Sequence, residues 1–522
     1  MNLIPSKPLP RDGWLGFLFG SNIYLKLCLL LFGLGILLLP ISSFPLLIRI
    51  SGASSVAPLS NLIFLLLVFI WIIPYLWGGG RVPLEGFLLL LFISLVVFTW
   101  GAALFLEIPP FRDVSIVSQG RSAFLTLIMA ACAFFVPATL LSFEKKWIHY
   151  AIVFINISGF IVLLWSLVQA VFVFFFNSNY PDALIRFQQL FSSRGYPLYS
   201  ARVTGFAYEP SWLAHQLVMV YLPFWLSASL SKFSVHRRKL WVFSIENLLL
   251  AGGVFVLFVT FSRIGILSFM LILGYIFMQL NIRLGRRIYQ WILNKKKIRG
   301  SLINLTKVSV ISVLFLSFVI VYLIAIIGLG YVGSFYEPRL ERIFTQPLTF
   351  EGFFELTNQL AFAERAVYWS TGLEVFNDFP ILGVGLGNAG YFFPEKMPSF
   401  GYSLWEISQL FNYESHIPNT KNMWVRILAE TGLIGFALFL SWYYVLWQSG
   451  RFSQRAPDPM LNVVGKFGHF VLIGFLLEGF SIDSFALPYF WFSMGLLVAA
   501  GFVSRKILHQ ANKTSEANDL PR

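Results

Sequence analysis

The chain contains little charge and almost no cysteine. Asp, Glu, Lys and Arg make up 12% of its 522 residues, whereas 57% are hydrophobic. A soluble protein of this length has no core large enough for so much apolar surface, so a soluble globular fold is excluded. The two cysteines, Cys28 and Cys132, lie inside apolar runs and are most simply packing residues. The sequence has no HExxH motif, no DxD motif and no carboxylate pair at metal-ligand spacing, so we expect chemistry without a metal or another cofactor.

Long hydrophobic runs are abundant instead. Runs of about 20 residues, enough for a helix to cross about 30 Å of hydrocarbon, recur along the chain and predict an all-α polytopic membrane protein with about twelve transmembrane helices. The first run follows Lys7 and Arg11 and lacks a small-residue cleavage site, so it is predicted to be a retained span. The predicted spans are 23–43, 59–79, 83–105, 122–142, 150–174, 211–230, 241–260, 263–282, 307–330, 422–447, 464–481 and 485–503.

Two predicted loops are long, at 175–210 and 331–421. The second has about 90 residues between helices nine and ten, far more than a simple connection needs. Its stretch FFELTNQLAFAERAVYWSTGLEVFND has apolar residues at helical spacing and predicts amphipathic helices at the membrane surface. The predicted organisation is 1–210 with five spans and the first loop, 211–330 with four spans, the loop 331–421, 422–503 with three spans, and the tail 504–522.

The distribution of Lys and Arg predicts the orientation. If both termini are cytoplasmic, the inside segments carry 24 of these residues and the outside segments carry 12. We therefore expect a multi-pass protein of the inner membrane of a cell with two membranes, with its large loop in the periplasm. The net charge of +14 would suggest a nucleic-acid partner in a soluble protein. Here the inside clusters HRRK, RLGRR and KKKIR are explained by orientation and by anionic membrane lipids, and no nucleic acid is expected.

The basic residues outside differ in kind from those inside. Inside, lysine and arginine are equal at twelve each, whereas ten of the twelve outside are arginine. An arginine fork grips phosphate or carboxylate through two parallel hydrogen bonds, which lysine cannot reproduce. This bias predicts an anionic ligand on the outer face. The ten are Arg49, Arg112, Arg121, Arg186, Arg194, Arg202, Arg263, Arg339, Arg342 and Arg365.

Two polar clusters at the ends of spans contain candidate anion-binding residues. In ARVTGFAYEPSWLAHQ, Glu209 directly precedes span six and could simply favour a helix start. Arg202, seven residues upstream, makes this pair more than a helix start requires. In TFSRIG, Arg263 lies in a turn so short that it must be at or just inside the membrane boundary. Snorkelling to the interface is the simpler explanation, but an ionisable residue at that depth is by default a functional candidate.

Two further clusters lie around the second long loop. ERAVYWSTGLEVFNDFPILGVGLGN carries Arg365, and its GVGLGN is similar to a dinucleotide loop but lacks a βαβ unit. We expect its glycines to make a tight re-entry toward the membrane. HIPNTKNMWVRILAETGLIGFALFL begins with His416, which could be a surface residue or a general base that titrates near neutral pH. Asn419 and Asn422 could orient His416 or contact a sugar.

The four clusters together resemble the bacterial O-antigen polymerase and O-antigen ligase superfamily. The segments that carry the resemblance are RVTGFAYEPSWLA, FSRIG, RAVYWSTGLEVFNDFPILGVGLGN, and a histidine followed by N, W and RILAETGLIG. They cover about 200–440 in the expected order. The resemblance implies a metal-independent glycosyltransferase of the GT-C class, whose donor is an oligosaccharide on a polyprenyl diphosphate carrier. It also implies membrane lipids and a chain-length regulator protein as candidate partners.

The resemblance also implies roles for single residues. Arg202 and Arg263 would hold the diphosphate, and Arg365 would assist from the long loop. His416 would activate the acceptor hydroxyl, with Glu209 as the rival base. The sequence EPS after Tyr208 favours a polymerase, which joins repeat units of a surface polysaccharide such as O-antigen, capsule or exopolysaccharide.

Other functions remain open at this point. A ligase would move the finished glycan to a lipid core, and another envelope glycan transferase is also compatible with the clusters. A transporter or flippase of an anionic or lipid-linked substrate belongs to a different class. Transporters place their sites near the midplane of the membrane, whereas the charged residues here collect at one face.

Overall fold

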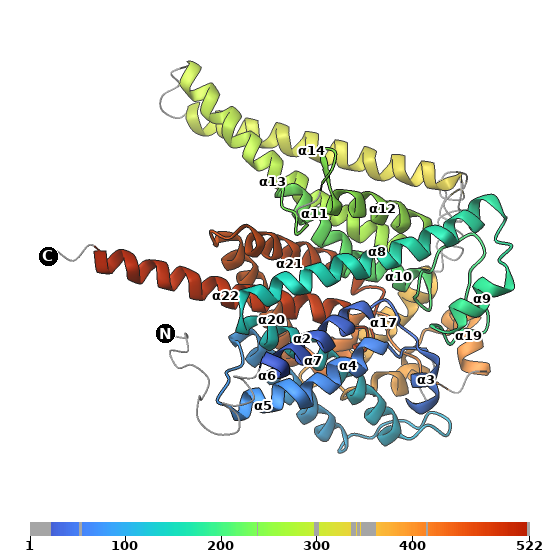
Figure 1. Ribbon diagram of the computed structural model, residues 1–522. Coiled ribbons are helices and arrows are strands. Elements are labelled where there is room, and N and C mark those ends of the chain that lie inside the picture. The colour runs from blue at the N-terminus through green and yellow to red at the C-terminus, as the bar shows by residue number, and fades with distance from the viewer. Residues whose placement is uncertain are drawn as a thin grey trace. The chain divides into compact units, whose positions relative to one another are not determined.

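The computed structural model describes residues 22–51, 55–236, 239–296, 302–335, 362–413 and 416–518, together with residues 341 and 345. The chain forms two compact units. The first comprises the described residues of Met1–Ile266 and Val367–Arg522, and the second those of Leu267–Ala366. Figure 1 labels the elements of both units.

Helices dominate both units, and two of the membrane-length helices are interrupted by a π turn. The long helices of the first unit without a π turn are α2 (Asn22–Leu37), α6 (Leu84–Ala103), α7 (Ile116–Phe143), α8 (Lys145–Phe175), α12 (Ile245–Val259), α20 (Met423–Arg455), α21 (Pro459–Glu478) and α22 (Tyr489–Asn518). The interrupted helices are α4, η1 and α5 (Leu59–Leu67, Val68–Ile72, Ile73–Trp77), and α10, η2 and α11 (Pro210–Gln216, Leu217–Tyr221, Leu222–Leu230). The second unit contains most of α13 (Arg263–Lys296) and all of α14 (Leu302–Ser334).

The prediction of an all-α polytopic membrane protein is confirmed. Each predicted span coincides with one of these helices, and ten of those described are long and apolar enough to cross a membrane. Two are shorter, with apolar parts at Ile23–Leu37 and Ile245–Val259. The second is short because the predicted run 241–260 begins in a hairpin, in which β1 (Lys239–Leu240) pairs antiparallel with β2 (Phe243–Ser244).

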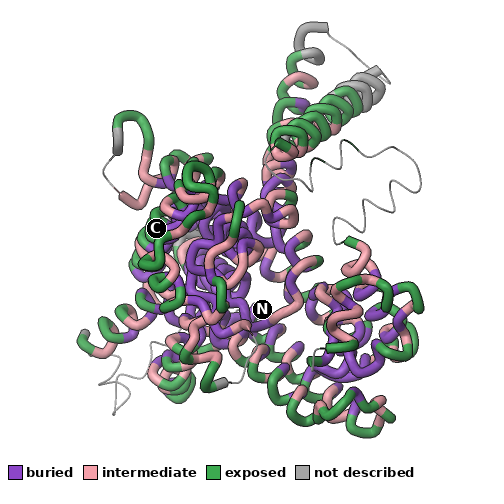
Figure 2. The backbone as a smooth tube through the Cα atoms, turned by 90° about the vertical axis from the view of Figure 1, so that its right-hand side faces the viewer, coloured by how far each residue is buried: buried purple, intermediate pink, exposed green. Residues whose placement is uncertain are grey.

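The core of the first unit lies around α22, which packs against α7, α20 and α21. Close approach is possible where small residues meet, as at Gly495 of α22, which faces the backbone of Phe134 in α7. Trp442 and Trp491 stack beside this contact with ring centroids 5.5 Å apart. Figure 2 shows buried residues concentrated inside the bundle. Many apolar side chains on its outside are exposed, which suits contact with lipid chains.

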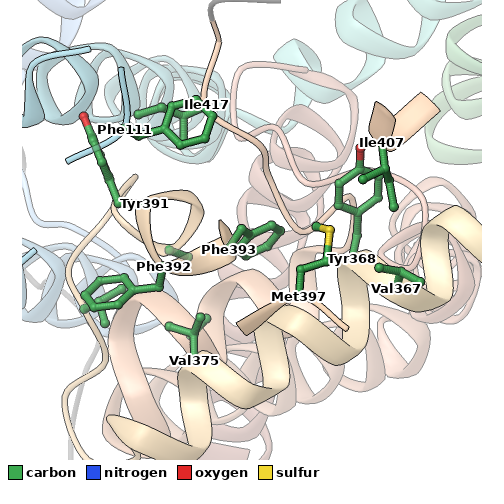
Figure 3. Packing of buried hydrophobic residues seen from close by; sticks show 13 residues of the cluster. Phe111, Val367, Tyr368, Val375, Tyr391, Phe392, Phe393, Met397, Ile407 and Ile417 are labelled. Carbon is green, nitrogen blue, oxygen red and sulfur yellow. The ribbon is translucent and has the colours of Figure 1, made fainter. Parts of the chain in front are cut away.

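The second long loop forms a small hydrophobic cluster with Phe111, which lies between α6 and α7, and with Ala429 of α20. Its described elements are α17 (Phe362–Asp378), η3 (Ala389–Phe392), α18 (Phe393–Lys396), η4 (Ser399–Ser403) and α19 (Trp405–Asn412). Tyr368 and Val375 of α17 pack with Phe393, Ile407 and Ile417 in one buried cluster (Figure 3). This packing holds the segment that leads into α20. The predicted position of these helices at the membrane surface stays a prediction.

Candidate functional site

Two buried glutamines hold the segment RVTGFAYEP. Gln169 of α8 accepts hydrogen bonds from the backbone amides of Thr204 (3.0 Å) and Gly205 (2.9 Å), and donates to the Gly205 carbonyl at 3.0 Å. Gln188 of α9 (Asp182–Gln189) donates to the same carbonyl at 2.9 Å and accepts from the Trp165 indole at 2.7 Å. Both glutamines are almost fully buried. Because the backbone groups are satisfied this way, the segment is fixed although it is not helical.

This fixed segment places Arg202 against the end of α12. Its Nε donates to the Thr260 carbonyl at 2.9 Å and its Nη2 to the Phe261 carbonyl at 3.3 Å. The Val203 amide also donates to the Val259 carbonyl at 3.2 Å. Arg263 follows Phe261 by two residues, so the structure brings together the arginine-bearing parts of the first two sequence clusters.

The motif TFSRIG has a structural explanation apart from its arginine. The Thr260 hydroxyl donates to the Leu257 carbonyl at 2.6 Å and accepts from the Ser262 amide at 3.2 Å. The Ser262 hydroxyl accepts from the Gly265 amide at 3.4 Å in the first turn of α13. A Cβ on Gly265 would lie 2.6 Å from that of Ala214, so glycine lets this turn approach α10 closely.

Glu209 is half-buried at the start of α10. Its carboxylate makes no hydrogen bond to a backbone amide of this helix, and its Oε2 instead accepts from the Ser211 hydroxyl at 3.1 Å. The simpler sequence interpretation, a carboxylate favoured by the helix dipole at the start of α10, needs no such bond and stays open. The structure leaves Glu209 a candidate for the site, on the same fixed segment as Arg202.

His215 of α10 forms a buried pair with Glu478 at the end of α21. The sequence interpretation missed this pair. Nδ1 of His215 and Oε2 of Glu478 lie 3.0 Å apart, with side chains 2% and 0% exposed. The other carboxylate oxygen of Glu478 is buried without a hydrogen-bond partner among the described residues. The sequence does show an acid at the end of an otherwise apolar span. Placing an ionisable group in a membrane costs free energy, so such a residue is a functional candidate.

The segment that contains His416 is attached to the same loop region as Glu478. The Met423 amide donates to the Gly479 carbonyl at 2.7 Å. The Lys421 amide lies 3.2 Å from Oδ2 of Asp483, in the connection between α21 and α22. These contacts join the start of α20 to the end of α21 and to the connection that follows it.

Within this segment, His416 is exposed and the residues after it are anchored. Ile417 and Pro418 are buried. A Cβ on Gly390 would lie 2.0 Å from the Pro418 carbonyl oxygen, so the two chains touch at this point. Asn419 is exposed and its Oδ1 accepts from the Lys421 amide at 3.2 Å. His416 thus stands at the surface on a base that α17, η3 and α19 hold in place.

Asn422 caps α20. Its Oδ1 accepts from the amides of Trp424 (2.9 Å) and Val425 (3.2 Å), as expected for an asparagine at a helix start. The side chain is fully buried, and its Nδ2 has no hydrogen-bond partner among the described residues. Capping accounts for the oxygen, whereas sugar binding by this residue stays a prediction.

An ion pair that the sequence interpretation did not single out ties this helix start to the neighbouring loop. Nε of Arg426 donates to Oε2 of Glu430, one turn later, at 3.0 Å, and its Nη1 donates to the Asp483 carbonyl at 2.6 Å. The side chains of Arg426 and Glu430 are only 13% and 7% exposed. Residues four apart are neighbours on a helix surface, so the spacing of Arg426 and Glu430 in the sequence could have predicted this pair.

The most specific sequence motif, RILAETGLIG, contains a break in α20. Gly432 has φ 64° and ψ −167°, a backbone conformation that is essentially restricted to glycine. The backbone groups that this break releases pair with the glycine-rich loop before it. Val384 and Gly385 amides donate to the Ala429 and Glu430 carbonyls (3.0 and 2.9 Å), and the Leu433 amide donates to the Pro380 carbonyl (2.8 Å). The loop packs closely on α6 and α7, whereas its re-entry toward the membrane stays a prediction.

Arg365 belongs to the second unit, in the first turn of α17. Its Nη1 is buried and has no hydrogen-bond partner among the described residues. Its role at the site stays a prediction. Arg339 and Arg342 lie outside the described residues, as does the beginning of the predicted amphipathic stretch, 353–361.

Some ionisable groups of the long loop have shifted pKa values. The hydrogen bond that Lys396 donates to the Asp378 carboxylate raises the pKa of Lys396. Burial raises the pKa of Tyr391, whose hydroxyl donates to the Val114 carbonyl at 3.2 Å. These contacts tie the loop to itself and to the start of α7. Within the described ranges, no three His, Cys, Asp or Glu side chains are grouped so that they could hold a metal ion.

Comparison with known families agrees with this arrangement. Residues 248–440 match the family model described as O-antigen ligase. The matched range begins in α12 and includes TFSRIG, the glycine-rich loop, His416 and the break at Gly432. This match confirms the predicted resemblance to the O-antigen polymerase and ligase superfamily. No curated protein matches the chain significantly.

Proposed function

We propose that this chain, which residues 248–440 place in the O-antigen polymerase and ligase superfamily, polymerises oligosaccharide repeat units that are carried on polyprenyl diphosphate. The reaction takes place on the periplasmic side of the inner membrane and builds a surface polysaccharide. The observation that carries the proposal is the fixation of Arg202 on the carbonyls of Thr260 and Phe261, three and two residues before Arg263.

The chemistry of the leaving group explains why this arrangement matters. When the bond between the donor sugar and the diphosphate breaks, the diphosphate takes the electron pair and gains negative charge. Guanidinium groups that are already oriented stabilise this charge without reorganisation at the moment of reaction. Two carbonyl contacts orient Arg202, and Arg263 begins a helix whose first turn is closed by Ser262. At the boundary of the membrane this stabilisation is stronger than it is in water.

A base must remove the proton from the acceptor hydroxyl as its oxygen attacks the anomeric carbon. We assign this role to His416, because it is exposed at the surface and the residues that follow it are packed against Gly390. Glu209 is the rival base, because it lies on the same fixed segment as Arg202 and its carboxylate makes no hydrogen bond to the backbone of α10. Asn419 contributes a weaker glycan contact.

The products separate a polymerase from a ligase. Purified protein in detergent, given lipid-linked repeat units alone, should lengthen the glycan on its carrier without an ion gradient. Transfer only after addition of a lipid core would establish the ligase, with which the family match agrees equally well. The element Glu209-Pro210-Ser211 supports the polymerase by its resemblance to other polymerases.

Charge-conserving substitutions test the arginine assignment. Arg202→Lys and Arg263→Lys should each lower turnover at least about 10²-fold, the usual cost of removing one oriented donor to a developing anion. Arg186→Lys is the matched control, because Arg186 is an exposed arginine of the first long loop. Thermal unfolding should be close to that of the wild type in all three. Near wild-type turnover from both site variants would contradict diphosphate binding by these arginines.

A further inference from the structure

A cluster of aromatic and basic side chains lies beside Glu209 and has no role in the steps described above. Two adjacent serines after α2 position it. The amide of Ser193 donates to the Ser43 carbonyl at 3.1 Å, and the two hydroxyls lie 2.7 Å apart. The Tyr208 amide donates to the Ser42 hydroxyl at 3.0 Å. Because Ser42 and Ser43 are neighbours, two parts of the chain fifteen residues apart are held side by side.

The side chains at this point form one stacked group. The guanidinium carbon of Arg194 lies 4.0 Å from the ring centroid of Tyr199 and 5.9 Å from that of Tyr208. The rings of Tyr208 and Trp212 have centroids 5.4 Å apart and are inclined by 34°. All four side chains are half-buried, so none is sealed in the core and none projects freely.

The polar ends of three of these side chains have no protein partner in the part of the chain that the structure describes. The Tyr208 hydroxyl, the Trp212 indole N–H and the Arg194 guanidinium make no side-chain hydrogen bond there, and Arg194 forms no ion pair. Half-buried tyrosine and tryptophan usually find a partner for these groups. An arginine stacked on a ring still presents the edge of its planar fork to a ligand. The cluster therefore combines apolar faces with unused hydrogen-bonding groups.

We propose that Arg194, Tyr208 and Trp212 form a saccharide subsite that binds a sugar of the glycan next to the reaction centre. A pyranose ring has an apolar C–H face, which packs on aromatic rings, and a rim of oxygens, which accept hydrogen bonds from arginine and indole N–H groups. The subsite adjoins Glu209 directly, since Tyr208 precedes this residue and Trp212 follows it by three. This inference rests on the proposed glycan transfer and names the part of the protein that recognises the glycan.

Kinetics on the purified full-length protein test the subsite. The probe is the lipid-linked repeat unit extracted from the cells that make the protein. Trp212→Ala and Arg194→Lys should raise KM roughly tenfold, the usual effect of truncating a central binding side chain. The kcat should change little, because neither residue touches the reacting atoms. Trp212→Phe should restore most of the affinity, because it keeps an aromatic face.

A matched control separates recognition from membrane anchoring. Tyr196 is an aromatic residue of the same loop, 89% exposed, and Tyr196→Ala should leave KM unchanged. Aromatic residues also gather at membrane interfaces without binding a ligand. If Trp212→Ala and Arg194→Lys keep the wild-type KM while the wild type is active, the subsite is refuted and interface anchoring explains the cluster. Should Trp212→Ala fail to fold, Arg194→Lys carries the same test.

Binding of the free glycan distinguishes failure of the subsite from failure of the proposed function. The oligosaccharide is released from its carrier by mild acid and observed by saturation-transfer difference NMR with the wild type and with Trp212→Ala. A wild type that binds the oligosaccharide but transfers nothing would contradict the proposed function and leave the subsite supported, provided that Trp212→Ala loses the signal. Equal signals from both proteins, or no signal from either, would refute the subsite.

Discussion

Replacing Gly432 by alanine should unfold the packing between α20 and the glycine-rich loop. The Cβ of an alanine here would lie 2.3 Å from both the carbonyl carbon and the oxygen of Ile381, a distance that real side chains do not adopt. The backbone conformation at Gly432 adds strain of about 1–3 kcal/mol for any other residue. Moving Ile381 away would also weaken the neighbouring backbone bonds, such as the bond from the Leu433 amide to the Pro380 carbonyl, at about 1 kcal/mol each. Together these terms predict a loss of about 3–5 kcal/mol.

The assay is thermal unfolding of the purified protein in detergent, with Gly101→Ala as the control. Gly101 lies in α6, and a Cβ there would meet nothing within 4 Å, so its substitution should be neutral or slightly stabilising. Gly432→Ala should lower the midpoint by several degrees. Gly383→Ala should do the same from the other side of the contact, because its Cβ would lie 2.5 Å from the Glu430 carbonyl carbon.

The double variant makes this reasoning sharper. If both glycines serve one contact, the loss in the double variant should be smaller than the sum of the two single losses. A midpoint for Gly432→Ala equal to that of Gly101→Ala would refute the reasoning, and fully additive losses would show that the two glycines act independently.

His416→Ala should lower turnover by about 10²- to 10⁴-fold while donor binding survives. Glu209→Gln should lower turnover much less. If a turnover assay gives the opposite ranking of the two variants, Glu209 is the base. Glu478→Ala should lower stability by about 1–3 kcal/mol, because the buried His215 loses its hydrogen-bond partner, whereas Glu478→Gln should cost less in thermal unfolding. A single cysteine introduced into the first long loop should react with an impermeant maleimide added from the periplasm. Both native cysteines are buried, so the label reports on the introduced cysteine. Labelling only after the inner membrane is permeabilised would contradict the proposed orientation.

The helices could be predicted from the sequence because lipid imposes a simple requirement. Apolar length alone locates a span, and every predicted run coincides with a helix. The departures have local causes. The run at 241–260 was predicted as a full span because its residues are apolar, but its first residues form the turn of the hairpin β1–β2. A two-residue strand leaves almost no pattern in a sequence this hydrophobic.

The partners of the candidate residues could not be predicted in the same way. His215 and Glu478 are 263 positions apart, and no periodicity links them. No sequence pattern distinguishes Gln169 and Gln188 from other polar residues, but they hold the segment that carries Arg202. Such contacts depend on how the helices pack, and packing is decided by shape rather than by composition.

The structure also changes how the motifs themselves should be interpreted. In RILAETGLIG, Gly432 makes the break possible, while Arg426 and Glu430 pair with each other at the start of the helix. In TFSRIG, the serine closes a helix start and Gly265 permits close packing on α10. In this chain, these positions maintain the broken helix and its close contacts.

Substrate choice must then depend on residues outside these structural positions. The proposed subsite at Arg194, Tyr208 and Trp212 precedes the range 248–440 that matches the family model. It is anchored on Ser42 and Ser43, which also lie outside that range. A recognition surface built on this part of the chain can change through Arg194, Tyr208 and Trp212 while the broken helix stays in place. The difference between joining repeat units and transferring them to another lipid should therefore be sought in the first long loop, before the difference is sought in the matched motifs.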